Sequence, residues 1–366
     1  MIEKKILKVV PFNFVPFSKT PWGGKAISQL KRKYFASHDA HIPERIGESW
    51  EISTDSQYPS LVELNEQHIQ PLTKILHTHS QQLLGDTFFQ KYASHCPLLL
   101  KWINASSNLS VQLHPSNSNS KLGEDECGKP ESWLVIENYE EQGYVYLGFK
   151  EGLSKNQIIK SLMKDELESC LFKYKPKKFD YISVPPGCVH AIGPELFLIE
   201  PQYILPNKQG KTWRISDWQR RYDEQGNLSV HGKPRQLHTA EAIEAIDWSL
   251  PTGNDIVANM IKNLSHEEIF LGNKYNPFAV QIFCQPGVVR YVPLQKNCFS
   301  LVTVWSGQVK LKTHHHRFEE LKAGESALIS CQADEILLTL ENYLDDQPEV
   351  AFFTLNEEVM LLDGIY

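Results

Sequence analysis

Four polar residues of the 366-residue chain have types and spacing suited to binding a metal ion. They are Gln112, His114, Glu131 and His190. Gln112 and His114 are two residues apart in a segment with the pattern of a β-strand, so both side chains point to one face. Glu131 begins another such segment, and His190 follows a Pro-Pro-Gly turn whose prolines fix the backbone. Two imidazoles, a carboxylate and an amide oxygen suit a divalent ion of the zinc type, and they leave a position for substrate or water.

This combination is more informative than any of its members. The chain has 14 histidines, and a single histidine is more often a satisfied core or surface residue than a ligand. No cysteine belongs to the set, which weighs against a structural zinc site. Three further histidines at 314–316 follow a lysine-rich strand pattern, and we interpret them as part of a solvated loop.

Composition and charge argue against several classes of function. The net charge is -7 and the chain has no basic stripe, so we expect no nucleic-acid partner. No stretch approaches the ~20 apolar residues that a membrane helix requires, and polar residues and prolines interrupt the first apolar run, unlike in a signal peptide. The seven cysteines form no CxxC pair, which is typical of a reducing compartment. We predict a cytoplasmic protein that is not bound to membranes and is either a monomer or a homodimer.

The elements that must position these residues are mostly short strands. Alternating or β-branched apolar patterns between turn residues predict strands at 97–103, 109–115, 131–137, 144–149, 181–187 and 195–202. Helical spacing of apolar residues predicts helices at 71–84, 154–172 and 239–248. The second of these helices opens with Ser154 and Gln157, which form a capping box.

The pattern changes after Trp248. Pro251, Gly253 and Asn254 indicate a linker, and a second β-rich block follows it. In this block, 299–312 and 321–330 resemble the strand-turn-strand units of a cupin, a small jelly-roll barrel. We therefore predict an all-β bicupin with a few flanking helices. Residues 1–250 would form the catalytic domain, and residues 251–366 a cupin-like domain without a metal.

Several segments of the first domain also resemble a known family. They occur in the family's order, and they are PWGG (21–24), GESWEIS (47–53), PLLLKWINASSNLSVQLHP (97–115), GKPESW (128–133), VPPGCVHAIG (184–193) and TWRISDWQR (212–220). Together they resemble class I mannose-6-phosphate isomerases, also called phosphomannose isomerases, in their short bacterial form. These enzymes belong to the cupin superfamily. The resemblance extends from about residue 12 to 222.

The resemblance implies a reaction and a set of site residues. The family interconverts mannose 6-phosphate and fructose 6-phosphate by moving a proton between C2 and C1, with one zinc ion per chain. Its zinc ligands fall on Gln112, His114, Glu131 and His190. Its catalytic arginine falls on Arg214, which we interpret as an electrostatic stabiliser because arginine stays protonated. Ser110 and Lys129 match positions that line the sugar-phosphate pocket.

The general base is open between two candidates, Glu200 and a zinc-bound water. Glu200 could instead be a structural carboxylate that orients a metal ligand. The chain also departs from the family pattern: residues 203–211 form a longer segment, and Phe179 stands where a glycine is usual. These departures leave two rival functions open. One is isomerisation or epimerisation of another phosphosugar, and the other is non-catalytic binding of a sugar phosphate.

Overall fold

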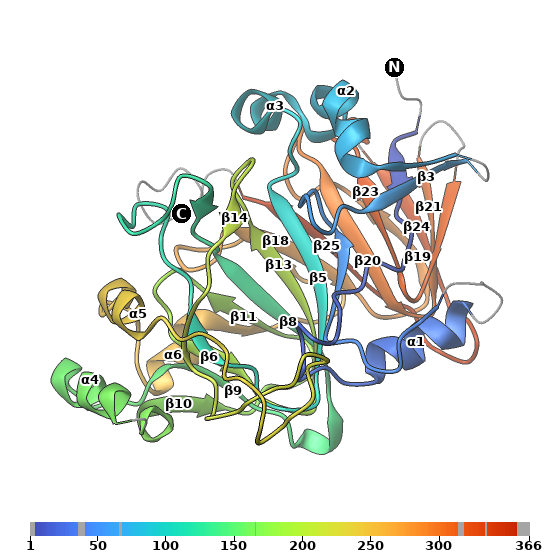
Figure 1. The fold of residues 1–366 in the computed structure, drawn as a ribbon. Coiled ribbons are helices and arrows are strands. Elements are labelled where there is room, and N and C mark those ends of the chain that lie inside the picture. Colours follow the sequence, from blue (N-terminus) through green and yellow to red (C-terminus); the bar gives the residue numbers. More distant parts are fainter. Residues whose placement is uncertain are drawn as a thin grey trace.

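The fold was examined in a computed structural model that describes residues 4–35, 41–65, 68–164, 166–313, 318–333 and 335–356. These parts of the chain are mostly β-structure, with six α-helices and two short 3-10 helices at their edges (Figure 1). The predicted predominance of strands is therefore confirmed.

Two sheets make up the part of the fold that holds the four predicted metal ligands. One has six strands in the order β16-β11-β8-β13-β5-β2, and the other has five in the order β10-β9-β12-β6-β15. The strands of the first are β2 (Glu48–Ile52), β5 (Leu98–Ala105), β8 (Glu131–Asn138), β11 (Asp180–Val184), β13 (Leu196–Tyr203) and β16 (Ile261–Asn263). Those of the second are β6 (Val111–Leu113), β9 (Val145–Phe149), β10 (Leu171–Tyr174), β12 (His190–Ile192) and β15 (Trp213–Ser216). Apolar side chains of both sheets form one shared core cluster, so the sheets pack face to face.

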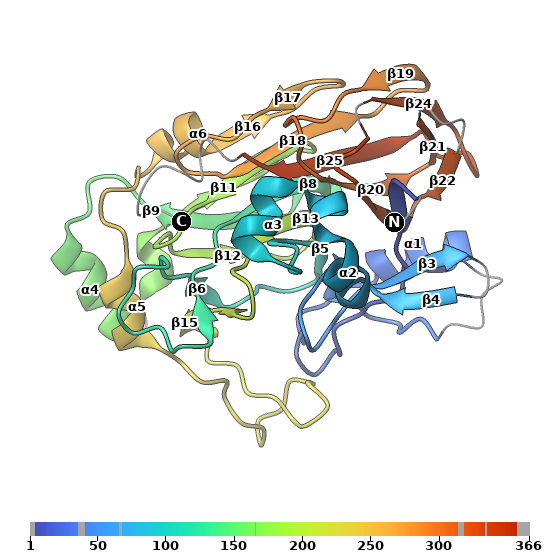
Figure 2. The same ribbon diagram turned by 90° about the horizontal axis from the view of Figure 1, so that it is seen from above.

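Two further sheets are formed mostly by the second half of the chain, drawn in orange and red in Figure 2, together with the N-terminal strand β1, drawn in blue. The six-stranded sheet has the order β1-β23-β20-β25-β18-β17, and the four-stranded sheet the order β19-β24-β21-β22. Their strands are β1 (Ile6–Lys8), β17 (Ile269–Phe270), β18 (Phe278–Phe283), β19 (Gly287–Tyr291), β20 (Ser300–Ser306), β21 (Gln308–Thr313), β22 (Phe318–Lys322), β23 (Glu325–Ile329), β24 (Ile336–Glu341) and β25 (Glu349–Leu355). A second apolar cluster fills the space between these sheets. The strands predicted within 299–312 and 321–330 are confirmed.

The two six-stranded sheets face one another through the largest apolar cluster of the protein. Strand β5 is covered on both of its faces, because all eight of its residues are buried. Leu100 and Trp102 point to the second half of the chain, whereas Lys101 and Ile103 point to the five-stranded sheet. This burial on both faces explains the nearly continuous apolar run at 97–103. Lys101 is the charged residue within this buried strand.

Two strands cross the predicted domain boundary at residue 250. β1 pairs with β23 of the second block, and β16 pairs with β11 of the first. Helix α6 (Asn254–Met260) begins at the last residue of the predicted linker, and its Ile256 and Met260 are buried four residues apart. Each part of the chain therefore contributes one strand to a sheet of the other part. The proposed division of the chain into two domains stays a prediction.

The other helices lie around the sheets. They are α1 (Ala26–Phe35), α2 (Leu72–Leu84), α3 (Asp86–Tyr92), α4 (Lys155–Met163) and α5 (Thr239–Ala245), with 3-10 helices at Tyr139–Glu141 and Leu167–Cys170. The remaining strands form two small pairs, β3 (Leu61–Asn65) with β4 (His68–Pro71), and β7 (Glu126–Cys127) with β14 (Gln209–Gly210). Within the described ranges, no helix is both long and apolar enough to cross a membrane.

The prediction of one helix over 154–172 was wrong in length. The capping box of Ser154 and Gln157 is present, but α4 ends at Met163 and strand β10 begins at Leu171. Ile158, Leu162, Leu167 and Leu171 are nevertheless buried in the same cluster. The helical spacing of these apolar residues therefore reflects their burial against one core. It does not mean that the backbone forms one continuous helix.

Phe179, at the position where glycine was expected, adopts a left-handed backbone with φ 67°. The turn geometry is thus kept without glycine, although a side chain with a Cβ is disfavoured there. The amide of Phe179 donates to the carbonyl of Val135 at 2.8 Å, which ties this turn to strand β8.

Candidate active site

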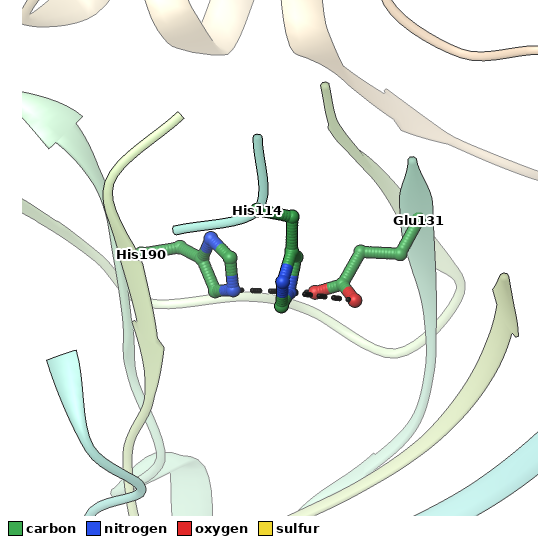
Figure 3. A group of neighbouring side chains, drawn as sticks. All are labelled: His114, Glu131 and His190. Carbon is green, nitrogen blue, oxygen red and sulfur yellow. Dashed lines mark ion pairs between the residues drawn. The ribbon is translucent and has the colours of Figure 1, made fainter. Parts of the chain in front are cut away.

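Three of the predicted metal ligands meet at one point between the two sheets of the first block (Figure 3). Glu131 begins β8 in the six-stranded sheet, His190 begins β12 in the five-stranded sheet, and His114 follows the end of β6. The amide of Gly187, in the Pro-Pro-Gly turn, donates to the carbonyl of His114 at 2.7 Å. This bond holds the turn that leads to His190 against the segment that carries His114.

The three side chains are buried and in contact. His114 Nε2 lies 3.1 Å from Glu131 Oε2, and His190 Nε2 lies 3.3 Å from Glu131 Oε1. Each side chain is no more than 2% exposed. Their candidate ligand atoms all lie within 4.8 Å of one another, which is close enough for one ion to contact all three.

Backbone carbonyls determine which ring nitrogen carries the proton. His114 Nδ1 lies 3.0 Å from the carbonyl oxygen of Lys211, and His190 Nδ1 lies 2.9 Å from that of Cys188. A carbonyl oxygen can only accept, so both Nδ1 atoms donate. The Nε2 atoms of the neutral rings are left as lone-pair donors aimed at Glu131, an orientation typical of metal-ligating histidines.

The charge state of the cluster suits a cation. Burial, followed by the charge of Lys129, lowers the pKa of His114 to about 4, so the ring is neutral near pH 7. Burial opposes ionisation of Glu131, but the neighbouring His114 and Lys129 outweigh it and hold the pKa of Glu131 well below its ordinary value. Among the described residues, the buried Nε2 of His114 has no hydrogen-bond partner. A lone pair facing a carboxylate oxygen in a buried site is unfavourable unless a cation lies between them, so these residues fit a metal ion.

Gln112, the fourth predicted ligand, lies beside this cluster. It is the register partner of His190 between β6 and β12, and its Nε2 lies 3.4 Å from His190 Nε2. Its Oε1 accepts a hydrogen bond from Ser110 Oγ at 3.1 Å. A half-turn of the amide would exchange the two atoms and present the oxygen to the same point as the imidazoles. Ser110 is therefore positioned next to Gln112, but it lines neither of the two cavities described below, and its role in the pocket stays a prediction.

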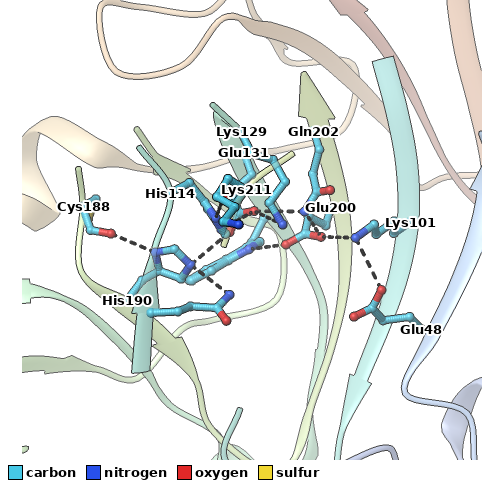
Figure 4. A network of polar contacts seen from close by, with 12 residues as sticks. Glu48, Lys101, His114, Lys129, Glu131, Cys188, His190, Glu200, Gln202 and Lys211 are labelled. Carbon is cyan, nitrogen blue, oxygen red and sulfur yellow. Dashed lines mark hydrogen bonds and ion pairs between the residues drawn. The ribbon is translucent and has the colours of Figure 1, made fainter. Parts of the chain in front are cut away.

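A second group of polar side chains adjoins the cluster on the inner face of the six-stranded sheet (Figure 4). Gln202 Nε2 donates to Glu131 Oε2 at 2.9 Å and to Glu200 Oε2 at 2.6 Å. The other oxygen of Glu200 accepts from Trp133 Nε1 at 3.0 Å. Lys101 Nζ lies 3.7 Å from Glu200 and 3.4 Å from Glu48.

Sequence reasoning had not assigned a role to Lys101, Glu48, Gln202 or Trp133. One signal was visible, because Lys101 is a charged residue within the apolar run 97–103. Glu200 and Gln202 are also two apart on β13, so they share a face.

The environment of Glu200 favours its protonated form. Burial, and then the charge of Glu131, raise the pKa of Glu200 to about 8, while Lys101 and Lys129 act in the opposite direction. Lys129 Nζ lies 3.8 Å from Glu131, and burial lowers the pKa of Lys129 despite the nearby carboxylates. The site thus holds two carboxyl groups with pKa values on opposite sides of neutrality, an arrangement found where proton transfer is catalysed.

Arg214 lies on β15, the strand next to β6, and its Cα is the register partner of Gln112. Directly opposed residues of an antiparallel pair share a face, so Arg214 extends from the same face as Gln112. Its Nη1 donates to the carbonyl of Gln236 at 2.9 Å, and its buried Nε has no partner. Burial, followed by the charge of Arg235, lowers the pKa of Arg214 to about 10, so the guanidinium stays charged at neutral pH.

Two cavities adjoin these residues. A small one of about 40 Å³ is lined by Gln112, Glu131, His190 and Glu200 among others. A larger one of about 200 Å³ shares Lys101, Lys129 and Gln202 with the first, and therefore adjoins it directly. Arg214 lines neither cavity. The histidines at 314–316 lie outside the described residues.

Comparisons with known proteins agree with this arrangement. Residues 15–141 match the model of the family described as phosphomannose isomerase type I, catalytic domain. The mannose-6-phosphate isomerase ManA of Bacillus subtilis (strain 168) is 29% identical over 261 residues, which are 69% of this chain and 74% of that protein. The mannose-6-phosphate isomerase of Streptococcus mutans is 31% identical over 234 residues, which are 64% of this chain and 66% of that protein.

A solved structure resembles nearly the whole fold. The mannose 6-phosphate isomerase of Bacillus subtilis superposes with a TM-score of 0.74 at 23% identity, and the match covers 96% of this chain and 100% of that one. This likeness concerns the fold. The β-rich fold and the buried cluster, together with the named relatives, define an enzyme of the isomerase class. Residues 15–141 carry the catalytic-domain pattern of the type I phosphomannose isomerases, the family that the chain resembles.

Proposed function

We propose that the protein interconverts mannose 6-phosphate and fructose 6-phosphate in a zinc-dependent reaction. The observation that carries the proposal is the buried contact between His114 Nε2 and Glu131, in which a lone pair faces a carboxylate beside His190. The names of the relatives support the substrate pair. The neighbouring cavity of about 200 Å³ provides space for a sugar phosphate.

His114, Glu131, His190 and Gln112 would hold the metal ion, with the amide of Gln112 turned by half a rotation from the orientation described above. Bound there, zinc would supply a Lewis acid that stabilises negative charge on the sugar oxygens. The donor set contains nitrogen and oxygen atoms and no thiolate, which is typical of a catalytic site with an open position.

Glu200 would move the proton between C2 and C1 of the sugar. Its carboxyl group is held by Trp133 Nε1 and Gln202 Nε2, and its pKa of about 8 allows it both to hold and to release a proton near neutral pH. Gln202 also donates to Glu131, so it fixes Glu200 relative to the metal cluster. Arg214 would stabilise negative charge without transferring a proton, because its guanidinium remains charged.

The proposed fold assignment is a bicupin, with the first cupin formed by the sheets around the metal cluster and the second by the two sheets of the later strands. The face-to-face pairing of a six-stranded sheet with a five-stranded or four-stranded one supports two jelly-roll units. The metal would be confined to the first unit.

A coupled assay of mannose 6-phosphate conversion to fructose 6-phosphate tests the function. We expect turnover that is lost on chelation and restored by added zinc. Failure of a folded, zinc-loaded protein to convert mannose 6-phosphate would contradict the proposal. The same assay repeated with other aldose and ketose phosphates would then separate a different isomerase from a protein that only binds its ligand.

A further inference from the structure

The segment at 203–211, longer than the family pattern, forms one wall of the larger cavity. Ile204, Lys208 and Gly210 from this segment line it, and the turn containing Thr54 and Asp55 lines it from another direction. The segment is also joined to the chain around it, because β14 within it pairs with β7. The segment is therefore part of the site's wall.

The two adjoining cavities differ in charge. The small cavity is lined by three glutamates, Glu48, Glu131 and Glu200, and by the two lysines that it shares with the large cavity. The large cavity is lined by three lysines, Lys101, Lys129 and Lys208, and by one carboxylate, Asp55. The large cavity therefore has an excess of positive charge, which favours the anionic group of a ligand.

Lys208 differs from the two other lysines of the cavity. Lys101 is near Glu48 and Glu200, and Lys129 is near Glu131. In the part of the chain that the structure describes, Lys208 has no carboxylate within ion-pair distance, whereas Lys211 of the same segment is paired with Glu126. Lys208 thus provides a charge in the cavity that no neighbouring side chain neutralises.

Gly210 brings the segment close to Lys129. A Cβ added at Gly210 would lie 2.8 Å from Lys129 Cδ and 2.6 Å from Ile204 Cδ1. The backbone at Gly210 therefore packs directly against the aliphatic part of Lys129, so that Lys129 and Lys208 reach the same cavity from neighbouring positions.

We propose that the large cavity is the subsite for the phosphate group of the substrate, and that Lys208 is the residue that determines specificity for this group. The inference rests on the proposed function for the identity of the substrate. A phosphate monoester carries a charge near −2 at neutral pH, and lysine binds it as a point charge. With the phosphate in this cavity, the opposite end of the sugar faces the smaller cavity, where Glu131, His190 and Glu200 are.

The test compares Lys208→Met and Lys208→Arg with Lys160→Met, a control at an exposed lysine of helix α4. Binding of inorganic phosphate to the zinc-loaded protein is measured by calorimetry, which does not depend on turnover. We expect Lys208→Met to raise the Kd about tenfold, as the loss of one charge-assisted contact would. Lys208→Arg should restore most of the affinity, and Lys160→Met should leave it unchanged.

The same variants are then assayed with mannose 6-phosphate. For Lys208→Met we expect a KM about tenfold higher with kcat changed by less than about twofold, because the residue binds a group remote from the reacting carbons. Equal phosphate affinity of Lys208→Met and Lys160→Met, or no phosphate binding by the unsubstituted protein, would overturn the subsite. Phosphate binding that depends on Lys208 without turnover of mannose 6-phosphate would support the subsite and contradict only the proposed function.

Discussion

His114 Nδ1 donates a hydrogen bond to the carbonyl oxygen of Lys211 over 3.0 Å. This bond joins a proposed metal ligand to the end of the longer segment that forms a wall of the larger cavity. It uses a backbone carbonyl, so it does not depend on the side chain at position 211. The side chain at position 211 can therefore change while the orientation of His114 is maintained.

Replacing either metal-binding histidine should remove the ion. His114→Ala and His190→Ala each delete one of two imidazole ligands, and we expect the bound zinc to fall from about one per chain to a small fraction of that. Elemental analysis after dialysis against a weak chelator measures the content. His77→Ala is the control, because His77 is exposed on helix α2. Stoichiometric zinc in both ligand variants would place the site elsewhere.

Arg214→Ala should reduce turnover while zinc stays bound. Arg214 extends from the same face of the sheet as Gln112 on the neighbouring strand, and removing one preorganised electrostatic group commonly lowers kcat by ~10²–10³-fold. Steady-state kinetics combined with zinc analysis of the same sample test both parts of the prediction. Turnover within a few-fold of the unsubstituted enzyme would contradict the role proposed for this arginine.

Glu200 should make the stability of the metal-free protein depend on pH. Burial, and then the charge of Glu131, raise the pKa of Glu200 to about 8 in the folded protein, whereas an unfolded glutamate titrates near 4.3. The folded state therefore binds the extra proton between these values, so this group's contribution to stability is lost as the pH rises through about 8.

Urea unfolding of the metal-free protein between pH 6.5 and 8.5 measures this effect. His114, with a pKa of about 4 in the folded protein and about 6.5 when unfolded, adds a slope of opposite sign only near the lower end of this window. We expect the free energy of unfolding to fall with pH in the unsubstituted protein and to change less in Glu200→Gln. Parallel pH profiles for the two proteins would show that Glu200 is not protonated in the folded state.

The buried ion pair between Lys31 and Glu51 should be important for stability. Lys31 Nζ lies 2.9 Å from Glu51 Oε1 and 2.6 Å from the carbonyl of Gly324, and both side chains are no more than 2% exposed. Because Gly324 follows β22 of the second block, the pair also joins the two halves of the fold. Lys31→Met would leave the charge of Glu51 buried without its cationic partner, and we expect a loss of about 3–5 kcal/mol in the free energy of unfolding.

Chemical denaturation measures this loss, and Lys25→Met is the matched control. Lys25 pairs with Glu44 at the surface, with side chains 57% and 70% exposed, so we expect its replacement to leave stability nearly unchanged. The double variant Lys31→Met, Glu51→Gln removes the unpaired charge and should recover part of the loss. A loss in Lys31→Met no larger than that in the control would contradict the prediction.

Much of the site was predictable because its residues lie on strands with local signals. Period-two alternation places Gln112 and His114 on one face, and the Pro-Pro-Gly turn before His190 indicates a fixed backbone. The structure confirms the proximity of His114, Glu131 and His190. Their roles, the oligomeric state and the cytoplasmic location stay predictions.

Other features depended on partners distant in the chain. Lys101, Glu200 and Gln202 become neighbours of Glu131 because β13 lies between β5 and β8 in the sheet, and strand order is not written in any single strand. The predicted helix at 154–172 was too long for a related reason. Burial in one cluster produced helical spacing across a helix, a 3-10 turn and the start of a strand.

The sequence by itself determined the donor types, the strands that carry them and the family that they resemble, because side-chain chemistry and alternation along a strand are local properties. Only the tertiary structure decided how two side chains of the same type come to have different pKa values. Glu131 is held ionised and Glu200 protonated, although both are buried glutamates on adjacent strands. The difference arises because a pKa depends on the desolvation and the charges around a group, and both depend on the packing of chain segments far apart in sequence.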